Sequence, residues 1–317
     1  MSDLRSEDEH VLDDRGDDTV EAGLEAVTGA GELRQSSLWG DAWRKLRRSP
    51  LFIFGALISL VLIVMAIVPQ LFTNTDPRAC NLSRSRQGPS SEAWFGYDVQ
   101  GCDYYANVVY GARNSITIGF TVVIGSITIG VVLGALSGYY GGTLDTVITR
   151  LTDIMFGLPT ILGAIVILTV LNQSLGRTVW TVSLALVVLG WMVPLRLLRS
   201  SVISVKGADY VSAARAMGSR ARRIIVRHVL PNSTGPVLVY ATIAIGSYIG
   251  AEATLSYLGI GLQLPDYSWG LQINSGQRWV RDAPHLVLFP GILLSITVLS
   301  FIIMGDALRD ALDPKNR

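Results

Sequence analysis

Apolar and polar positions along this chain are separated into long blocks. Six blocks carry almost no charge, and each is close to the length of about 20 residues that a helix needs to cross the hydrocarbon core of a bilayer. The pattern therefore predicts an all-α integral membrane protein with six transmembrane helices. The predicted spans are Leu51–Val68, Ser115–Tyr140, Ile154–Leu171, Thr178–Leu195, Pro236–Leu258 and Leu286–Gly305.

The polar segment Lys206–Asn232 separates the fourth and fifth predicted spans, inside a basic loop of residues 196–235. Asp209 is predicted to cap a short helix that Gly218 stops. Ser219 is predicted to start a second helix and Pro231 to end it. The exposed face of the first helix is predicted to carry only small side chains, those of Ala213, Ala214 and Ala216. Two short helices with such a face are typical of a segment that docks in a groove of another protein.

The first 50 residues differ from the spans that follow. Residues 1–35 are rich in Asp, Glu, Gly and Ser, which predicts a disordered acidic tail; a solvated extension is favoured over a docking segment. Residues 36–50 predict an amphipathic helix in the headgroup region. Its apolar positions are Trp39, Ala42, Trp43 and Leu46. Ser49 and Pro50 fit the N-cap and first turn of the first span, so residues 51–317 are predicted to form the six-span domain.

Charge is divided unevenly between tail and body. Residues 1–33 hold 11 of the 25 acidic residues, whereas residues 34–317 hold 24 bases and 14 acids. These bases lie beside apolar spans, where topology and anionic lipid explain them, so nucleic acid is not indicated as a partner. With the N-terminus inside, sixteen bases fall in inside segments and seven in outside segments. This excess predicts a multi-pass protein of the cell membrane with both termini in the cytoplasm.

The predicted orientation makes residues 73–114 an extracytoplasmic loop, which holds both cysteines, Cys80 and Cys102. An oxidising compartment favours a disulfide between them, worth about 3 kcal/mol in the chain-entropy model; two unpaired thiols are the alternative. No cysteine or histidine has metal-ligand spacing, so no metal site is predicted.

Catalytic signatures are sparse. The chain has three lysines, none of which follows Gly as in a phosphate-binding loop, and no nucleophile set or carboxylate pair stands out. We therefore expect a chain that is not an enzyme and holds no cofactor. If a nucleotide drives this protein, another chain binds it.

Two features lie inside the predicted spans. Glycines recur every four residues in the second and fifth spans, at Gly130, Gly134 and Gly138 and at Gly246 and Gly250. This spacing lets helices approach closely, and plain packing is favoured over a sliding surface. Glu252 is the one acid well inside an apolar segment and is a candidate for a translocation path. Contact with a partner helix and a bond to a neighbouring loop are the alternatives, and a structural role is preferred.

The sequence DYVSAARAMGSRARRIIVRHVLPN, residues 209–232, resembles the EAA loop of permeases in binding-protein-dependent ABC importers. It has the alanine pair, a glycine four residues later and a closing Leu-Pro, while Ser212 stands where the motif has Glu. In that family the loop forms a coupling helix that docks on an ATPase subunit. The resemblance implies ATPase coupling by Asp209, Ser212, Ala213, Ala214, Arg215, Gly218, Leu230 and Pro231.

Three more segments resemble the C-type permeases of dipeptide, oligopeptide and nickel importers. They are GYDVQGCDYYANVVYGARNS (Gly96–Ser115), EATLSYLGIGLQLPDYSWG (Glu252–Gly270) and GDALRDALDP (Gly305–Pro314). Tyr97 and Cys102 replace a Thr and an Arg of the family pattern. The resemblance extends over residues 40–317.

The resemblance implies the type I ABC importer permease fold and half of a translocation path. A homologous second permease, two ABC ATPase subunits that bind ATP and Mg²⁺, and an extracytoplasmic substrate-binding protein are the implied partners. Peptide is the expected substrate and nickel the alternative, because nothing in the chain supplies metal ligands. A secondary transporter is disfavoured because no internal repeat is visible and Glu252 is a lone ionisable candidate. A simple membrane anchor would need no helix-Gly-helix loop.

Overall fold

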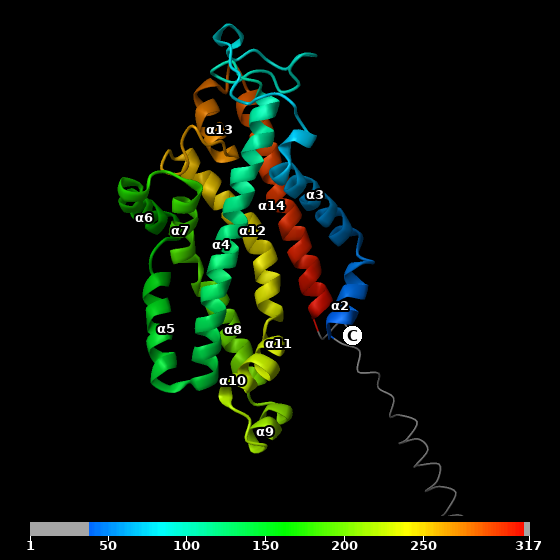
Figure 1. The fold of residues 1–317 in the computed structure, drawn as a ribbon, viewed down its shortest axis with the longest axis vertical. Coiled ribbons are helices and arrows are strands. Elements are labelled where there is room, and N and C mark those ends of the chain that lie inside the picture. Colours follow the sequence, from blue (N-terminus) through cyan, green and yellow to red (C-terminus); the bar gives the residue numbers. More distant parts are fainter. Residues whose placement is uncertain (1–37, 314–317) are drawn as a thin grey trace, which may run out of the picture. The chain divides into compact units, whose positions relative to one another are not determined.

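The computed structural model describes residues 38–313, and every regular element among them is helical (Figure 1). The chain divides into two units, Met1–Asp41 and Ala42–Arg317, and the second contains every helix discussed below except the first four residues of α2 (Leu38–Leu46). The predicted disordered tail, residues 1–35, lies outside the described residues.

Among the described residues, five helical segments are long and apolar enough to cross a membrane. They are α3 (Pro50–Ile67), α4 (Tyr104–Tyr140), the consecutive helices α7 (Val179–Gly190) and α8 (Met192–Val205), α12 (Gly235–Tyr257) and α14 (His285–Leu312). These segments confirm the first, second, fourth, fifth and sixth predicted spans.

The third predicted span, Ile154–Leu171, is wrong as a single helix. Helices α5 (Gly142–Phe156) and α6 (Thr160–Leu175) occupy this stretch and are bent by 91° relative to each other. Pro159 explains the break, because proline has no N–H for a helical bond and excludes the preceding residue, Leu158, from the helical region. The sixth crossing, if α5 and α6 form one, is therefore a broken span.

Side-chain caps fix where α3 and α4 begin. Before α3, the Ser49 hydroxyl accepts a hydrogen bond from the Phe52 N–H at 3.3 Å, and Pro50 occupies the first turn, as predicted. The second predicted span begins too late, because Asp103 caps α4 by accepting from the Ala106 N–H at 2.8 Å. The loop predicted at residues 73–114 is shorter for this reason.

Helix α2 (Leu38–Leu46) precedes α3, with Ala42 and Leu46 buried while Trp43 remains exposed. The Lys45 ammonium donates to the Asp310 carbonyl near the end of α14 at 2.9 Å. The N-terminal and C-terminal helices of this unit therefore meet.

The glycines of α4 are packing residues. A Cβ at Gly134 would lie 2.7 Å from the Leu195 carbonyl oxygen, and one at Gly138 would lie 2.9 Å from the Arg199 carbonyl oxygen. These contacts place the backbones of α4 and α8 directly against each other. In α12, Gly246 approaches the backbone of Val298 in the same way, whereas Gly250 faces open space. The structure thus favours packing for the α4 series and for Gly246.

Candidate functional site

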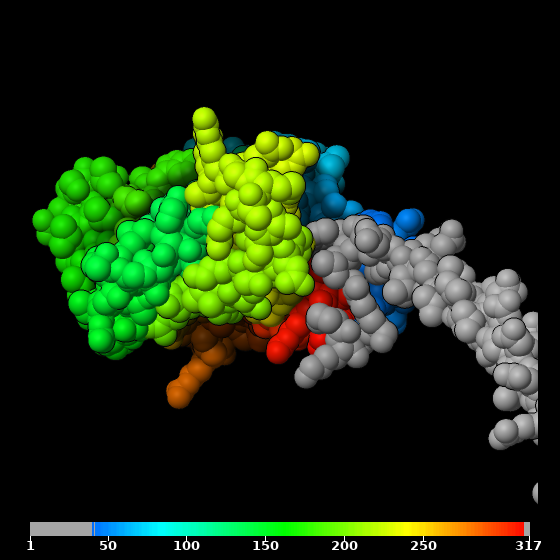
Figure 2. Space-filling view, turned by 90° about the horizontal axis from the view of Figure 1, so that it is seen from below, coloured from blue at the N-terminus to red at the C-terminus, as the bar shows by residue number. Residues whose placement is uncertain are grey.

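The segment between α8 and α12 lies at one end of the unit, opposite α13 (Trp269–Gly276) (Figure 1). Figure 2 looks onto this end and shows the yellow-green atoms of the segment in the middle of the face, beside the green atoms of α4 and α5. Helix α9 (Asp209–Ala216) is followed by Gly218, whose φ of +76° is a left-handed conformation that suits glycine. The prediction that Gly218 stops the first helix is confirmed.

The predicted cap of α9 is wrong. Ala208 holds the N-cap position, and its carbonyl accepts from the N–H groups of Val211 and Ser212. Asp209 is the first helical residue and makes no side-chain capping bond. Its carboxylate still stands at the positive end of the helix dipole, which is a favourable place for an acid.

The second helix of this segment also begins and ends at residues other than those predicted. Arg220, not Ser219, is the N-cap of α10 (Ala221–Ile224). A π-helical turn then leads into α11 (Leu230–Ser233), so Pro231 does not end the helical path. Pro231 is the second residue of α11, directly after the π-helical turn, and has no N–H to donate to that turn.

The exposed face of α9 is not made of alanines alone. Ala214 is buried together with Val211, and both pack into a cluster with Leu198 and Val202 of α8. Ser212, Ala213 and Ala216 remain exposed and form a strip of small side chains. At helical spacing, the exposed side chains of Tyr210 and Met217 border this strip on one side and Arg215 borders it on the other.

Arginines dominate the rest of this surface. Five are exposed, and none forms an ion pair with an acid of residues 38–313: Arg215, Arg220, Arg222, Arg223 and Arg227. Leu230 is half-buried against the α8–α9 cluster, so it helps to anchor the segment, whereas Pro231 is exposed. A small-faced helix with a basic surround can present itself to an acidic, grooved partner.

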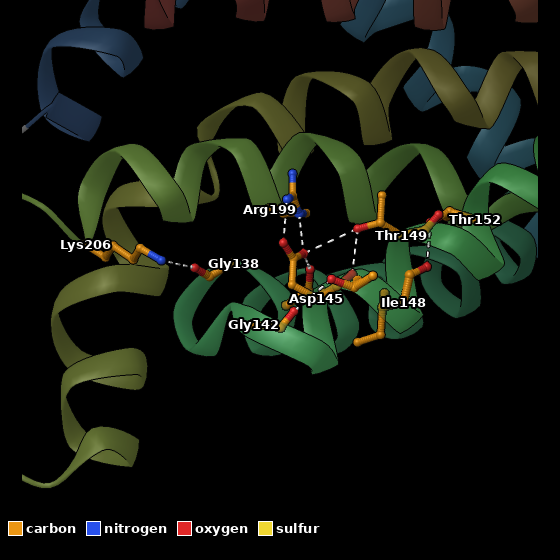
Figure 3. A network of polar contacts seen from close by, with 10 residues as sticks. Gly138, Gly142, Asp145, Ile148, Thr149, Thr152, Arg199 and Lys206 are labelled. Carbon is orange, nitrogen blue, oxygen red and sulfur yellow. Dashed lines mark hydrogen bonds and ion pairs between the residues drawn. The ribbon is translucent and has the colours of Figure 1, made fainter.

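A polar network holds the base of this segment (Figure 3). Arg199 of α8 binds Asp145 of α5 through two parallel contacts, Nε to Oδ1 at 2.5 Å and Nη2 to Oδ2 at 2.6 Å. Ser137 of α4 also donates to the Asp145 carboxylate. Lys206, just after α8, donates to the Gly138 carbonyl at the end of α4, with an Nζ–O distance of 2.8 Å.

Sequence reasoning missed Asp145 and Arg199. They are 54 positions apart, and each lies at the edge of an apolar block where a charge is ordinary. The sequence shows only that the two residues have opposite charges and lie at the same predicted edge of the membrane. That information does not identify which charged residues form a pair.

The other end of the unit brings together two of the recognised segments, Gly96–Ser115 and Glu252–Gly270. The Trp269 indole donates to the Val108 carbonyl at 3.0 Å, and its backbone N–H donates to the Ser115 hydroxyl at 3.2 Å. The Asn114 amide donates to the Tyr267 carbonyl at 2.8 Å. Residues that are far apart in the sequence thus form one interlocked structure around α13.

A tight turn and a disulfide close this end. Cys80 and Cys102 are joined by a disulfide. The Asp98 carboxylate accepts from the N–H groups of Gln100 and Cys102, both at 2.8 Å, and from the Asn107 amide at 3.0 Å. Burial raises the pKa of Asp98 above its ordinary value, although these hydrogen bonds act in the opposite direction.

Glu252 is not exposed on a path in this structure. Its side chain is fully buried, and it accepts from the hydroxyls of Ser256 at 2.7 Å and Ser115 at 3.2 Å. Ser256 in turn accepts from the backbone N–H of Leu262 in the following loop. These contacts link α4, α12 and a loop, as the structural alternative predicts, and the role of Glu252 in a translocation path stays a prediction.

Comparison with known proteins gives consistent matches. Residues 130–317 match the family described as binding-protein-dependent transport system inner membrane component. Residues 37–89 match the N-terminal TM domain of oligopeptide transport permease C.

Individual relatives cover nearly the whole chain. The dipeptide transport system permease protein DppC of Alkalihalophilus pseudofirmus is 41% identical, over 88% of this chain and 90% of that protein. The oligopeptide transport system permease protein OppC of Bacillus subtilis is 36% identical, over 92% of this chain and 96% of that protein. Among solved structures, an inward-facing MetNI methionine ABC transporter has a similar fold, with a TM-score of 0.55, 18% identity, and coverage of 65% of this chain and 96% of that chain.

Proposed function

This chain belongs to the inner membrane components of binding-protein-dependent transport systems, and on that basis we propose that it is the permease subunit of an ATP-driven peptide importer. The names of two relatives, a dipeptide and an oligopeptide permease that align over most of their length, support peptide as the substrate class. The chain forms one half of the translocation path, and a homologous second permease forms the other half.

Helix α9 is the proposed contact with a cytoplasmic ABC ATPase. It is exposed on one side, anchored on the other by Val211 and Ala214, and surrounded by arginines without acidic partners in residues 38–313. A short helix that is anchored in this way transmits a push to the helices beneath it, which a flexible loop would absorb. The α9 end is then cytoplasmic, and we propose the same side of the membrane for both termini.

The disulfide end is the proposed extracytoplasmic face. The segment between α3 and α4 is held by the Cys80–Cys102 bond and by the Asp98 turn, so it presents a defined surface. An extracytoplasmic substrate-binding protein docks there and delivers the peptide. The disulfide supports this placement because such bonds persist in oxidising compartments.

Purification of the tagged chain from its native membrane tests the proposal. We expect two ABC ATPase subunits and a second permease to purify with it, and the complex in liposomes to accumulate a labelled dipeptide only with ATP and the binding protein. A chain that purifies without any ATPase, or uptake that needs an ion gradient instead of ATP, would contradict the proposal.

A further inference from the structure

The junction between α5 and the α8–α9 segment joins a weakly anchored helix to a strongly anchored one. In α5 only Ile148 and Thr152 are buried, whereas α8 and α9 share a continuous apolar cluster with the end of α4. The Thr152 hydroxyl bonds the carbonyls of its own helix, so it adds no link to a neighbour (Figure 3). The apolar attachment of α5 to α8 therefore rests on the small cluster around Ile148.

The far end of α5 is held to α8 through the exposed side chain of Arg196, which pairs with Asp153 and lies over the Phe156 ring. The chain breaks after Phe156 and bends by 91° into α6. Helix α6 is held separately, because Ala164 and Leu168 are buried against Val182 and Leu186 of α7. Because α6 is held on its own and the chain is broken between the two helices, α5 can shift relative to α6 unless its start is tied firmly to α8.

Two ion pairs join α5 to α8, and they differ in burial. Asp145 and Arg199 are 20% and 30% exposed and make two parallel hydrogen bonds, with further support from Ser137 and Thr149. Asp153 and Arg196 are 46% and 47% exposed and make one hydrogen bond at 2.6 Å, while the Arg196 guanidinium also lies 4.1 Å from the centre of the Phe156 ring, a contact that Asp153→Asn leaves in place. Solvent screens an exposed pair, so the Asp145–Arg199 pair is the effective link and the Asp153–Arg196 pair is a natural control.

Helix α8, which carries Arg199, is coupled closely to α9. Helix α8 ends at Val205, only three residues before α9, and Lys206 fixes that turn to the Gly138 carbonyl. Val211 and Ala214 bind α9 to the same cluster that contains Leu198. A displacement of α9 therefore carries α8 and the Arg199 guanidinium with it.

We propose that the Asp145–Arg199 pair is the positioning clamp that makes α5 move as one body with α8 and α9, so that a push on α9 reaches the broken α5–α6 segment. The inference rests on the proposed function, because it assumes that an ATPase displaces α9. Asp145 and Arg199 act through α5 and touch no substrate.

The test uses the complex purified with its ATPase subunits and reconstituted in liposomes. Uptake and ATP hydrolysis are measured together for the single variants Asp145→Asn, Asp145→Arg and Arg199→Asp. The double exchange combines Asp145→Arg with Arg199→Asp, and Asp153→Asn is the matched control. We expect the peptide transported per ATP hydrolysed to fall about tenfold in the single variants, to recover in the double exchange, and to stay at the wild-type value in the control.

A distance measurement reports the movement itself. The two cysteines of the chain are joined in the disulfide, so cysteines introduced at the exposed positions Thr143 of α5 and Ser204 of α8 take spin labels selectively. The label distance is expected to stay narrow with and without ATP in the wild type and the Asp153→Asn control. In Asp145→Asn it is expected to broaden when ATP is bound.

Each result decides between the alternatives. A lower melting temperature with an unchanged transport-to-ATP ratio in Asp145→Asn means that the pair only stabilises the fold, and this overturns the clamp. If the single variants fail to fold, the double exchange decides, since wild-type coupling supports the clamp and lost coupling overturns it. A wild-type complex without ATP-driven uptake would instead overturn the proposed function.

Discussion

The α9 end and the disulfide end of residues 42–317 satisfy their polar groups in different ways. At the disulfide end, the Asp98 carboxylate and the Trp269 indole are bonded within the chain, and Cys80 and Cys102 close the loop covalently. At the α9 end, the five arginines have no acidic partner in the part of the chain that the structure describes. The first end is held together by bonds within the chain, whereas the second presents those arginines and a helix with a small-residue face.

The difference indicates how a transport subunit divides its tasks. Under the proposed function, the disulfide end receives a delivered substrate, and the α9 end converts a partner's motion into helix displacement. The close contact of α4 with α8 connects the two ends, because α4 runs from the disulfide end to the network at Lys206 (Figures 1 and 3).

Gly134→Val would disrupt the α4–α8 contact that connects the two ends, and it is expected to have the largest effect. The new Cβ would lie 2.7 Å from the Leu195 carbonyl oxygen. The backbones of α4 and α8 are packed against each other, so they cannot separate without losing their contacts. We expect a cost of about 3 kcal/mol or more, seen as a lower melting temperature and poor recovery of folded protein in detergent. Gly250→Val is the control, since a side chain there meets open space. Equal melting temperatures for the two variants would refute the packing account.

Removal of the disulfide would loosen one end only. The bond spans 22 positions, and replacing both cysteines by serine is expected to cost about 3 kcal/mol in the chain-entropy model. Limited proteolysis should then cut residues 73–103 faster, as should reduction of the wild-type protein. The ATPase should still purify with the chain. Loss of the ATPase from this variant would show that the ends are not separable.

Arg215→Glu would change the other end without disturbing the fold. Its exposed side chain has no acidic partner in residues 38–313, so the melting temperature of the chain is expected to stay at the wild-type value. The ATPase should dissociate at lower salt, because a repulsive charge replaces an attractive one. Arg278→Glu, an exposed arginine in the segment between α13 and α14, serves as the control. An equal response in both variants would argue against a docking role.

The sequence predicts most of the spans because charge-free blocks of sufficient length have few alternatives to a membrane crossing. Local signals with one clear chemical meaning also succeed, such as Ser49 before Pro50 and Gly218 after a helix. Pro159 is visible in the sequence as a residue that breaks helices, but the angle between α5 and α6 depends on the packing of α6 against α7. Ala214 was placed on the wrong face because the direction of burial is set by Leu198 and Val202, which precede it in the chain. The Asp145–Arg199 pair depends entirely on tertiary structure.

The coupling ratio of a Gly218→Val variant tests the central claim most directly, that α9 passes ATPase motion into the spans. A valine at a φ of +76° forces the α9–α10 turn to rearrange, at a cost of about 1–2 kcal/mol, while the space around it stays open. Gly235→Val is the matched control, since its Cβ also meets open space and its φ is not left-handed. We predict continued ATP hydrolysis with a strong loss of peptide uptake in Gly218→Val, and normal coupling in Gly235→Val. Wild-type uptake per ATP in Gly218→Val would contradict the claim.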